Sequence, residues 1–242
     1  MNSGISIVIP AYNEEVRLGK TLRHIITHCT QRKYTIEIII VDDGSTDNTA
    51  GVVKETQKQY PDAEIHHVFY SMNRGKGYAV KQGMLQARYD WILLTDSDLA
   101  TPIEELDRFL KYLQYDIIIG SRAVQGAEVV TSFHKKLLGR IGNMLINMLA
   151  VKGVKDTQCG FKLFKKRVAQ KLFPLQTIDR FGFDFEILYL AQRYKYTIRE
   201  IPVHWVNQPG SKVHGSDYLK TFFELLKIRW NAIKGVYPRV IE

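Results

Sequence analysis

Cysteine is nearly absent from this 242-residue chain, which contains only Cys29 and Cys159. Two cysteines are too few for a disulfide framework or a structural zinc site, so we expect a protein of a reducing compartment. Aromatic residues make up 11% of the chain and charged residues 24%. This composition excludes a largely disordered chain and leaves enough apolar residues for a sizeable core.

The chain also lacks a hydrophobic run that could span a membrane. Its longest apolar stretch, residues 137–151, is interrupted by Arg140, Asn143 and Asn147 and is shorter than the ~20 residues that a spanning helix needs. Residues 1–4 contain no basic region and lead directly into an apolar run, so we expect no signal peptide. The sequence therefore predicts a protein that can lie on a membrane but does not cross one.

Acidic residues are scarce in the second half of the chain. Residues 1–120 contain 13 Lys and Arg against 16 Asp and Glu, whereas residues 121–242 contain 21 against 9, so the halves carry −3 and +12 of the net +9. A basic half suits nucleic acid, an anionic membrane surface, or simply a solvated face. Because no nucleic-acid recognition motif is present and the basic residues are spread out, we expect no nucleic-acid partner.

Short apolar runs alternate with helical patterns throughout residues 1–120. Unbroken β-branched runs are typical of strands that are buried on both faces, as in a parallel sheet. The alternation therefore predicts an open α/β sheet with helical crossovers. The predicted strands are residues 5–9, 36–41, 65–69, 91–94 and 117–119, and the predicted helices are residues 16–29, 47–59, 78–87 and 102–113.

Polar, charged and glycine-rich residues follow each of these five predicted strands. In an open α/β sheet, ligands bind in the crevice beyond the carboxyl ends of the strands. One polar loop is weak evidence of a site, but five in succession place the expected site along this edge. The five clusters are residues 10–15, 42–45, 71–76, 95–98 and 120–122.

Three of these clusters hold candidate ligand-binding residues. Asp96 and Asp98 can converge on one hard cation such as Mg²⁺ or Mn²⁺, which favours oxygen ligands, although acidic residues also suit the start of a helix. Asp43 is a candidate acceptor for a ribose or a base N–H. Lys76 lies between two glycines beside a helix start and is a candidate diphosphate contact, although the segment does not match the P-loop pattern.

Four motifs, in this order and at this spacing, resemble those of family 2 glycosyltransferases with the GT-A fold. They are residues 8–15, 41–47, 73–77 and 96–98, and they cover the first half of the chain. Residues 120–122, 156–162 and 210–213 resemble segments of the polyprenyl-phosphate sugar transferases, which include dolichyl-phosphate glucosyl- and mannosyltransferases. Residues 183–186, followed by 202–205, are more similar to the glucosyl branch, so the resemblance extends over nearly the whole chain.

The resemblance implies a role for particular residues at the ends of the strands. Asp96 and Asp98 would bind Mg²⁺ or Mn²⁺, while Arg122 and Arg140 would bind the acceptor phosphate. Lys212 would cover the donor diphosphate, and the catalytic residues would be Asp98, Arg122 and Lys212. The residues expected to contact the nucleotide-sugar are Pro10, Ala11, Tyr12, Glu14, Asp43, Lys76, Asp96 and Ser97.

The implied activity is transfer of a hexose, with glucose favoured, from a nucleotide-sugar, with UDP favoured, to a polyprenyl or dolichyl phosphate. A lipid monophosphate is already ionised near neutral pH, so we expect inversion at the anomeric carbon without a dedicated base. Arg122 would hold this anion against the anionic donor. The resemblance places such an enzyme as a peripheral protein on the cytoplasmic face of a membrane.

The expected architecture is an α/β, GT-A, mostly parallel sheet flanked by helices. Residues 1–215 would form the catalytic domain, in which 1–122 bind the nucleotide-sugar and 123–215 face the acceptor, and 216–242 would form a C-terminal amphipathic helix. Helices at 134–151 and 218–236 would either lie on anionic lipid or pack against the catalytic domain or a second subunit. The sequence leaves this choice and the oligomeric state open.

Several alternatives remain at this level. The mannosyl branch often has Gln where this chain has Ala100, which argues against a GDP-mannose donor without excluding it. A glycosyltransferase with a soluble or polysaccharide acceptor is the main alternative. A nucleotidyltransferase is improbable, because it would need a glycine-rich loop after the first strand, where this chain has Pro-Ala-Tyr-Asn-Glu at residues 10–14. Asp184 and Glu186 are candidates to face the donor sugar, but two residues apart on a helix at most one can do so.

Overall fold

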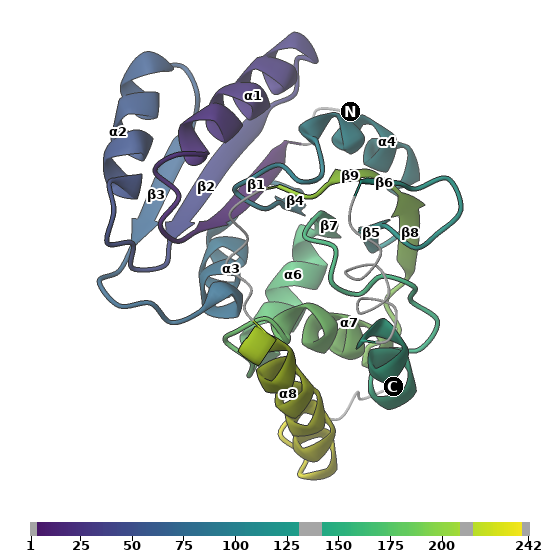
Figure 1. Ribbon diagram of the computed structural model, residues 1–242. Coiled ribbons are helices and arrows are strands. Elements are labelled where there is room, and N and C mark those ends of the chain that lie inside the picture. Colours follow the sequence, from purple (N-terminus) through teal and green to yellow (C-terminus); the bar gives the residue numbers. More distant parts are fainter. Residues whose placement is uncertain (1–3, 131–141, 209–214, 239–242) are drawn as a thin grey trace.

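The computed structural model describes residues 4–130, 142–208 and 215–238 (Figure 1). Seven strands form one sheet in the order β3-β2-β1-β4-β7-β5-β8, in which all neighbours are parallel except those of β7. β6 (Glu128–Val130) and β9 (His204–Val206) pair separately. The strands of the main sheet are β1 (Ile5–Ala11), β2 (Ile36–Asp42), β3 (Ile65–Phe69), β4 (Trp91–Leu94), β5 (Ile117–Ser121), β7 (Lys162–Lys165) and β8 (Ile198–Pro202).

The central strands are buried on both faces, as their unbroken apolar runs predict. All seven residues of β1 are buried, and its side chains alternate between two cores. Ile7 and Ile9 pack on one face of the sheet, while Val8 packs on the other. Helices are therefore required on both sides of the sheet, and the expected α/β, mostly parallel fold is confirmed.

Each face of the sheet has its own group of helices. One face packs against α1 (Leu18–Gln31), α2 (Thr49–Gln59) and a segment made of η1 (Ile103–Glu105), α4 (Leu106–Phe109) and η2 (Leu110–Tyr112). The single helix expected over 102–113 is thus broken into short turns. The other face packs against α3 (Lys76–Gln86), α6 (Lys166–Leu172), η3 (Phe173–Leu175), α7 (Phe183–Arg193) and α8 (Gly215–Ile233).

The strand order reverses between β1 and β4, which places the ligand crevice of this fold at their carboxyl ends. The chain runs from β1 outward to β2 and β3 and then returns to place β4 on the other side of β1. β7 enters between β4 and β5 in the opposite direction, with Lys162 paired to Leu94 and Ile119. The start of β7 therefore lies at the same edge as the ends of its neighbours.

α8 projects from the body of the molecule and keeps much of its apolar surface exposed (Figure 1). Leu225 and Ile228 are buried in the same core as α7, as is Tyr237 beyond the helix. Within the described part of the chain, no helix combines the length and the hydropathy that crossing a bilayer requires. The exposed large apolar residues of α8 are Leu219, Phe222, Phe223, Leu226, Trp230 and Ile233.

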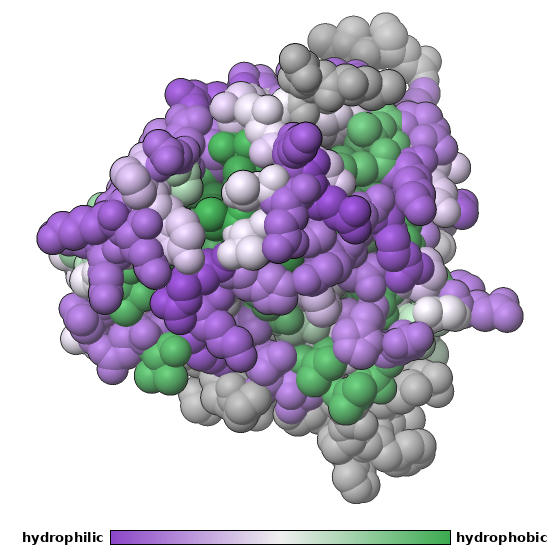
Figure 2. Space-filling view, turned by 90° about the horizontal axis from the view of Figure 1, so that it is seen from above, coloured by the Kyte–Doolittle hydropathy of each residue, from purple (hydrophilic) through white to green (hydrophobic). Residues whose placement is uncertain are grey.

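A second helix over 142–149 also exposes apolar side chains, with Met144 64% and Met148 68% exposed. It lies within the segment 134–151 that the sequence predicts to be helical, and residues 131–141 fall outside the described part. In contrast to these two helices, the face seen in Figure 2 is mostly hydrophilic, with apolar residues only in small patches.

Candidate functional site

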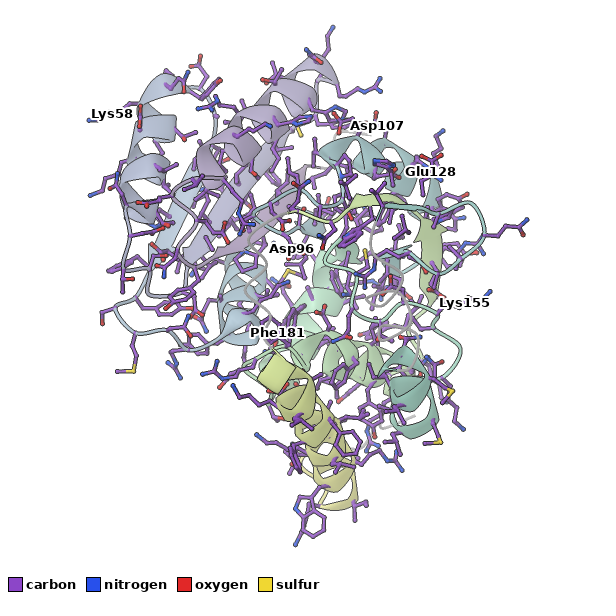
Figure 3. All side chains as sticks on the ribbon, in the orientation of Figure 1. Lys58, Asp96, Asp107, Glu128, Lys155 and Phe181 are labelled. Carbon is purple, nitrogen blue, oxygen red and sulfur yellow. The ribbon has the colours of Figure 1, made fainter. Side chains whose placement is uncertain are left out.

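Asp96 and Asp98 follow the end of β4, at the edge of the sheet where the strand order reverses. Figure 3 shows Asp96 near the centre of the molecule. Burial raises the pKa of Asp98, and the nearby negative charge of Asp96 raises it further. One Asp98 carboxylate oxygen accepts a hydrogen bond from the Ala100 N–H at 3.0 Å. The charge of Asp96 thus disfavours ionisation of Asp98 in a partly buried place.

Lys76, the first residue of α3, supplies the nearest positive charge. Its Nζ lies 2.6 Å from Asp96 Oδ1. Burial of the Asp96 carboxyl group opposes its ionisation, but the charges of Lys76, Lys162 and Arg122 outweigh this effect and lower its pKa. Lys76 therefore forms an ion pair with Asp96 in this structure. Its expected contact with a donor diphosphate remains a prediction.

Lys162 and Asp184 form a buried ion pair beside these groups. The Lys162 side chain is 1% exposed and that of Asp184 is 7% exposed. Lys162 Nζ donates to a carboxylate oxygen of Asp184 and, at 2.6 Å, to the Cys159 carbonyl. Since buried charges are stable only when they are paired, each of these residues requires the other.

Glycine at position 160 is required by the position of Asp96. A Cβ built on Gly160 would lie 2.0 Å from Asp96 Oδ2 and 2.5 Å from its Cγ. The turn that leads into β7 therefore packs its bare backbone against the carboxylate. This contact brings the Asp96 loop next to the turn that carries Cys159 and Lys162.

Asp43 organises the loop before α3 through both of its carboxylate oxygens. Tyr70 Oη and the Arg74 N–H donate to Oδ1 at 2.7 and 2.8 Å, while Asn73 Nδ2 and the Gly75 N–H donate to Oδ2, each at 2.9 Å. Asp43 is 4% exposed. The sequence predicts a nucleoside contact for this residue, but the hydrogen bonds within the chain give it a structural role that the sequence did not reveal.

Gly75 completes this loop with a backbone conformation that favours glycine. Its φ is +111°, and a Cβ there would lie 2.5 Å from the Asp179 carbonyl oxygen. Lys76 follows directly, so Asp43 and Gly75 together fix where α3 begins.

Arg17 lies between Glu14 and Asp98, which belong to different sequence motifs. Its Nε and Nη2 donate to the two Glu14 carboxylate oxygens at 2.8 and 2.7 Å. Its Nη1 lies 3.9 Å from Asp98 Oδ2. Glu14, expected to hold the nucleoside, thus positions an arginine beside the aspartate pair, and Arg17 is a site residue that sequence reasoning missed.

The remaining expected nucleotide contacts line the ends of β1 and β4. Pro10 and Ala11 are buried within β1 beside the end of β2, whereas Tyr12 is 36% exposed. Ser97 is 8% exposed, and its carbonyl accepts the Thr21 hydroxyl at 2.7 Å. The structure brings these residues to one edge, and their contact with a nucleotide remains a prediction.

Arg122 is held in place by a buried acidic residue. Its Nε and Nη2 donate to the two carboxylate oxygens of Asp156 at 2.7 and 2.8 Å, and its guanidinium lies 5.3 Å from the ring centre of Trp205. Nη1 takes no part in this fork. Asp156 and Trp205 were not predicted as site residues, although both lie in segments that carry the resemblance.

Two expected residues cannot be placed, and one open question is answered. Arg140 and Lys212 lie outside the described residues. Glu186 is fully buried and accepts hydrogen bonds from the Thr177 and Ile178 N–H groups and from the Tyr237 hydroxyl, so it is structural. Asp184 pairs with Lys162 near Asp96, and its contact with a donor sugar remains a prediction. Lys162, the partner of Asp184, could have been noticed in the sequence, because a charged residue at the start of a buried apolar strand needs a partner of opposite charge.

The oxygen donors at the end of β4 suit a divalent cation. Asp96 and Asp98 offer two carboxylates, and a cation between them would offset the charge of Asp96 that disfavours ionisation of Asp98. Two protein carboxylates, with substrate phosphates as further ligands, are a common set for Mg²⁺. A different group, Glu37, Glu64 and His66, also converges, but Arg88 donates to both glutamates and already supplies its positive charge.

Comparisons with known proteins show the family of the chain. The model of the family "Glycosyl transferase family 2" matches residues 6–173. A dolichyl-phosphate beta-glucosyltransferase from Dictyostelium discoideum is 36% identical over 251 residues, which cover 98% of this chain and 77% of that protein.

Solved structures share the fold at low sequence identity. Mannosyltransferase PcManGT from Pyrobaculum calidifontis, in complex with GDP-Man and Mn²⁺, matches with a TM-score of 0.67 at 18% identity, covering 96% of this chain and 64% of that one. Glucosyl-3-phosphoglycerate synthase from Mycobacterium tuberculosis, in complex with Mn²⁺, UDP-glucose and phosphoglyceric acid, matches with a TM-score of 0.66 at 18% identity. This match covers 94% of this chain and 80% of that one.

The structural role of Asp43 can be tested without any ligand. Asp43→Ala would leave the Arg74 N–H and the buried Gly75 N–H without their acceptor, so we expect a loss of about 2–4 kcal/mol of unfolding free energy. Urea denaturation measures this loss, and hydrogen exchange should show faster exchange of those two amides. The exposed Asp62 provides the control, since Asp62→Ala should change stability by less than about 0.5 kcal/mol. Unchanged amide protection in Asp43→Ala would contradict this role.

Proposed function

The chain belongs to glycosyl transferase family 2 and is a glycosyltransferase, and we propose that it transfers glucose from UDP-glucose to a polyprenyl or dolichyl phosphate with inversion. The observation that carries the proposal is the placement of Asp96 and Asp98 at the strand-order reversal, among Lys76, Lys162 and Arg122. Such an arrangement suits a diphosphate and a cation. The 36% identity to a dolichyl-phosphate beta-glucosyltransferase favours glucose and a lipid phosphate.

In this proposal the donor lies across the ends of β1, β2 and β4. Asp96 and Asp98 hold Mg²⁺ or Mn²⁺, which when bound stabilises the charge that develops on the departing nucleoside diphosphate. Burial and the charge of Asp96 raise the pKa of Asp98, and a cation bound there would favour its charged form. Tyr12, Glu14 and the other expected contacts lie around the nucleoside, and Lys212 completes the diphosphate site.

The acceptor phosphate binds at Arg122 in this proposal, with Arg140 as a second cation. Asp156 fixes two nitrogens of the Arg122 guanidinium, and the third, Nη1, is then available to a phosphate. Because the side chain is already ordered, binding the phosphate costs less conformational entropy. A phosphate monoester anion attacks the anomeric carbon without losing a proton to the protein. Residues 1–122 then serve the donor and 123–215 the acceptor.

The membrane supplies this acceptor, and α8 is the proposed contact with its surface. Phe223, Trp230 and Ile233 are 66, 59 and 75% exposed on this helix. Lys220, Lys227, Arg229 and Lys234 lie between the apolar residues of the same segment, and such a mixture suits the boundary between acyl chains and anionic headgroups. We propose that the protein is peripheral on the cytoplasmic face, with 216–242 as its amphipathic segment.

The activity is tested by incubating the protein with a short-chain polyprenyl phosphate, Mn²⁺ and either UDP-glucose or GDP-mannose, with mass detection of the lipid product. We expect glucosyl transfer from UDP-glucose that stops when EDTA removes the metal. Asp98→Asn should reduce turnover by at least about 100-fold, because losing even an outer-shell partner of a metal costs ~10–100-fold. Transfer from GDP-mannose alone, or only to a soluble sugar acceptor, would overturn the proposal.

The role of Arg122 is tested in a variant that does not strand a buried charge. Arg122→Gln combined with Asp156→Asn removes both members of the pair, and we expect the KM for polyprenyl phosphate to rise by at least about tenfold, as for loss of a charge-assisted hydrogen bond. The KM for UDP-glucose should stay within about twofold of the parent value. A twofold change corresponds to much less free energy than one charge-assisted hydrogen bond. Arg167→Gln, which removes an exposed arginine that pairs with Asp116, is the control. Equal acceptor KM values in the double variant and the parent would remove Arg122 from the acceptor site.

Membrane contact through α8 is tested by flotation with phosphatidylcholine vesicles, with and without phosphatidylserine. We expect co-flotation that phosphatidylserine strengthens. Phe223→Ser with Trp230→Ser should weaken vesicle binding by at least about tenfold, since burying each side chain contributes roughly 1.5–3 kcal/mol. Phe69→Ser removes a similarly exposed aromatic residue on β3 and should have no effect. Equal flotation of both variants would show that α8 is not the contact.

A further inference from the structure

Two ion pairs, made of four charged side chains, lie near each other at the carboxyl edge of the sheet. Lys76 pairs with Asp96, and Lys162 pairs with Asp184. The two pairs also act on each other: the charge of Lys162 acts on Asp96, and that of Asp184 acts on Lys76. We call these four residues the charge ring, and its formal net charge is zero.

Close backbone contacts hold the members of the ring together. A Cβ on Gly77 would lie 2.7 Å from the Ile178 carbonyl oxygen and 2.8 Å from the Phe183 Cβ, so the start of α3 packs directly on the start of α7. This contact places Lys76 beside Asp184. On the other side, Gly160 packs against Asp96 and precedes Lys162 by two residues.

The two lysines of the ring differ in their freedom to move. Lys162 is 1% exposed and is also tied to the Cys159 carbonyl, so it is fixed. Lys76 retains 26% exposure, and Asp96 retains 34%. Lys76 is therefore the member that can leave Asp96 and turn toward a ligand in the crevice.

Lys76 also opposes the arrival of any other cation at Asp96. Its ammonium lies 2.6 Å from Asp96 Oδ1, so a divalent ion that binds Asp96 would have to displace this ammonium or lie close to it. The ion would meet like charge, which a partly buried site screens little. A nucleoside diphosphate brings negative charge that can hold both the ion and the displaced ammonium.

We infer, given the metal site proposed above on which this rests, that Lys76 is a resident counter-ion of Asp96 that makes metal binding depend on the donor diphosphate. Without a nucleotide, Lys76 neutralises Asp96 and keeps the affinity for metal low. With the nucleotide bound, Lys76 turns to the diphosphate and Asp96 is freed for the ion. Asp184 keeps Lys76 within reach of both positions.

The test measures Mn²⁺ binding to the whole chain, by the EPR signal of free Mn²⁺, without nucleotide and with saturating UDP. For the parent we expect weak binding that UDP strengthens by at least about fivefold, a typical coupling between two sites. Lys76→Met should bind Mn²⁺ more tightly than the parent without UDP, and UDP should strengthen its binding less. Lys76→Arg keeps the charge and should resemble the parent.

Lys81→Met is the matched control, because Lys81 lies on the same helix but donates to the Pro174 and Gln176 carbonyls outside the ring. It should leave Mn²⁺ binding with and without UDP unchanged. Thermal unfolding verifies that each variant is folded. Mn²⁺ affinity without UDP that is equal or lower in Lys76→Met than in the parent would overturn the role of Lys76. This measurement uses neither sugar nor lipid, so a wrong sugar or acceptor would not alter its outcome.

Discussion

The crowding of charge at the end of β4 is the constraint on which the rest of the site depends. The charge of Asp96 disfavours ionisation of Asp98, and both carboxylates are partly removed from water. Lys76, Lys162, Arg17 and Arg122 surround them from four different segments of the chain. Such a cluster is stable only while its charges are balanced, so any ligand that changes the balance must bring a compensating charge. A metal ion and a diphosphate together meet this requirement.

The antiparallel strand β7 is what makes this balance attainable. Because it runs against its neighbours, its first residue lies at the edge where theirs end, and this residue is the buried Lys162. A parallel strand in the same place would have put its carboxyl end there instead. The glycine before it allows the backbone to touch Asp96 directly. The sheet thus departs from parallel pairing at the point where the site needs a fixed cation.

The sequence predicted the alternation of strands and helices and the site at the strand ends, because those depend on local periodicity and on turn residues. It did not predict where β7 inserts, since the pairing of a four-residue strand is decided by contacts far along the chain. For the same reason, the partners of known candidates were missed: Arg17 for Glu14, Asp156 for Arg122, and Lys162 for Asp184. Asp43 illustrates the limit most clearly, because its hydrogen-bond donors lie about 30 residues away in a loop whose shape no local pattern encodes.

The start of α7 joins the donor edge to the helix proposed to contact the membrane. Glu224 of α8 accepts a hydrogen bond from the Gly182 N–H at 2.8 Å, and Gly182 directly precedes the helix that carries Asp184. Figure 3 shows Phe181 beside the end of α8 that is nearer the body of the molecule. A Cβ on Gly182 would meet the same glutamate, so the backbone before α7 packs directly on the Glu224 side chain of α8. The apolar face of α8 and the charge ring are therefore joined by a few direct contacts, which in the proposed function would hold the lipid-bound acceptor and the donor diphosphate in fixed positions relative to each other.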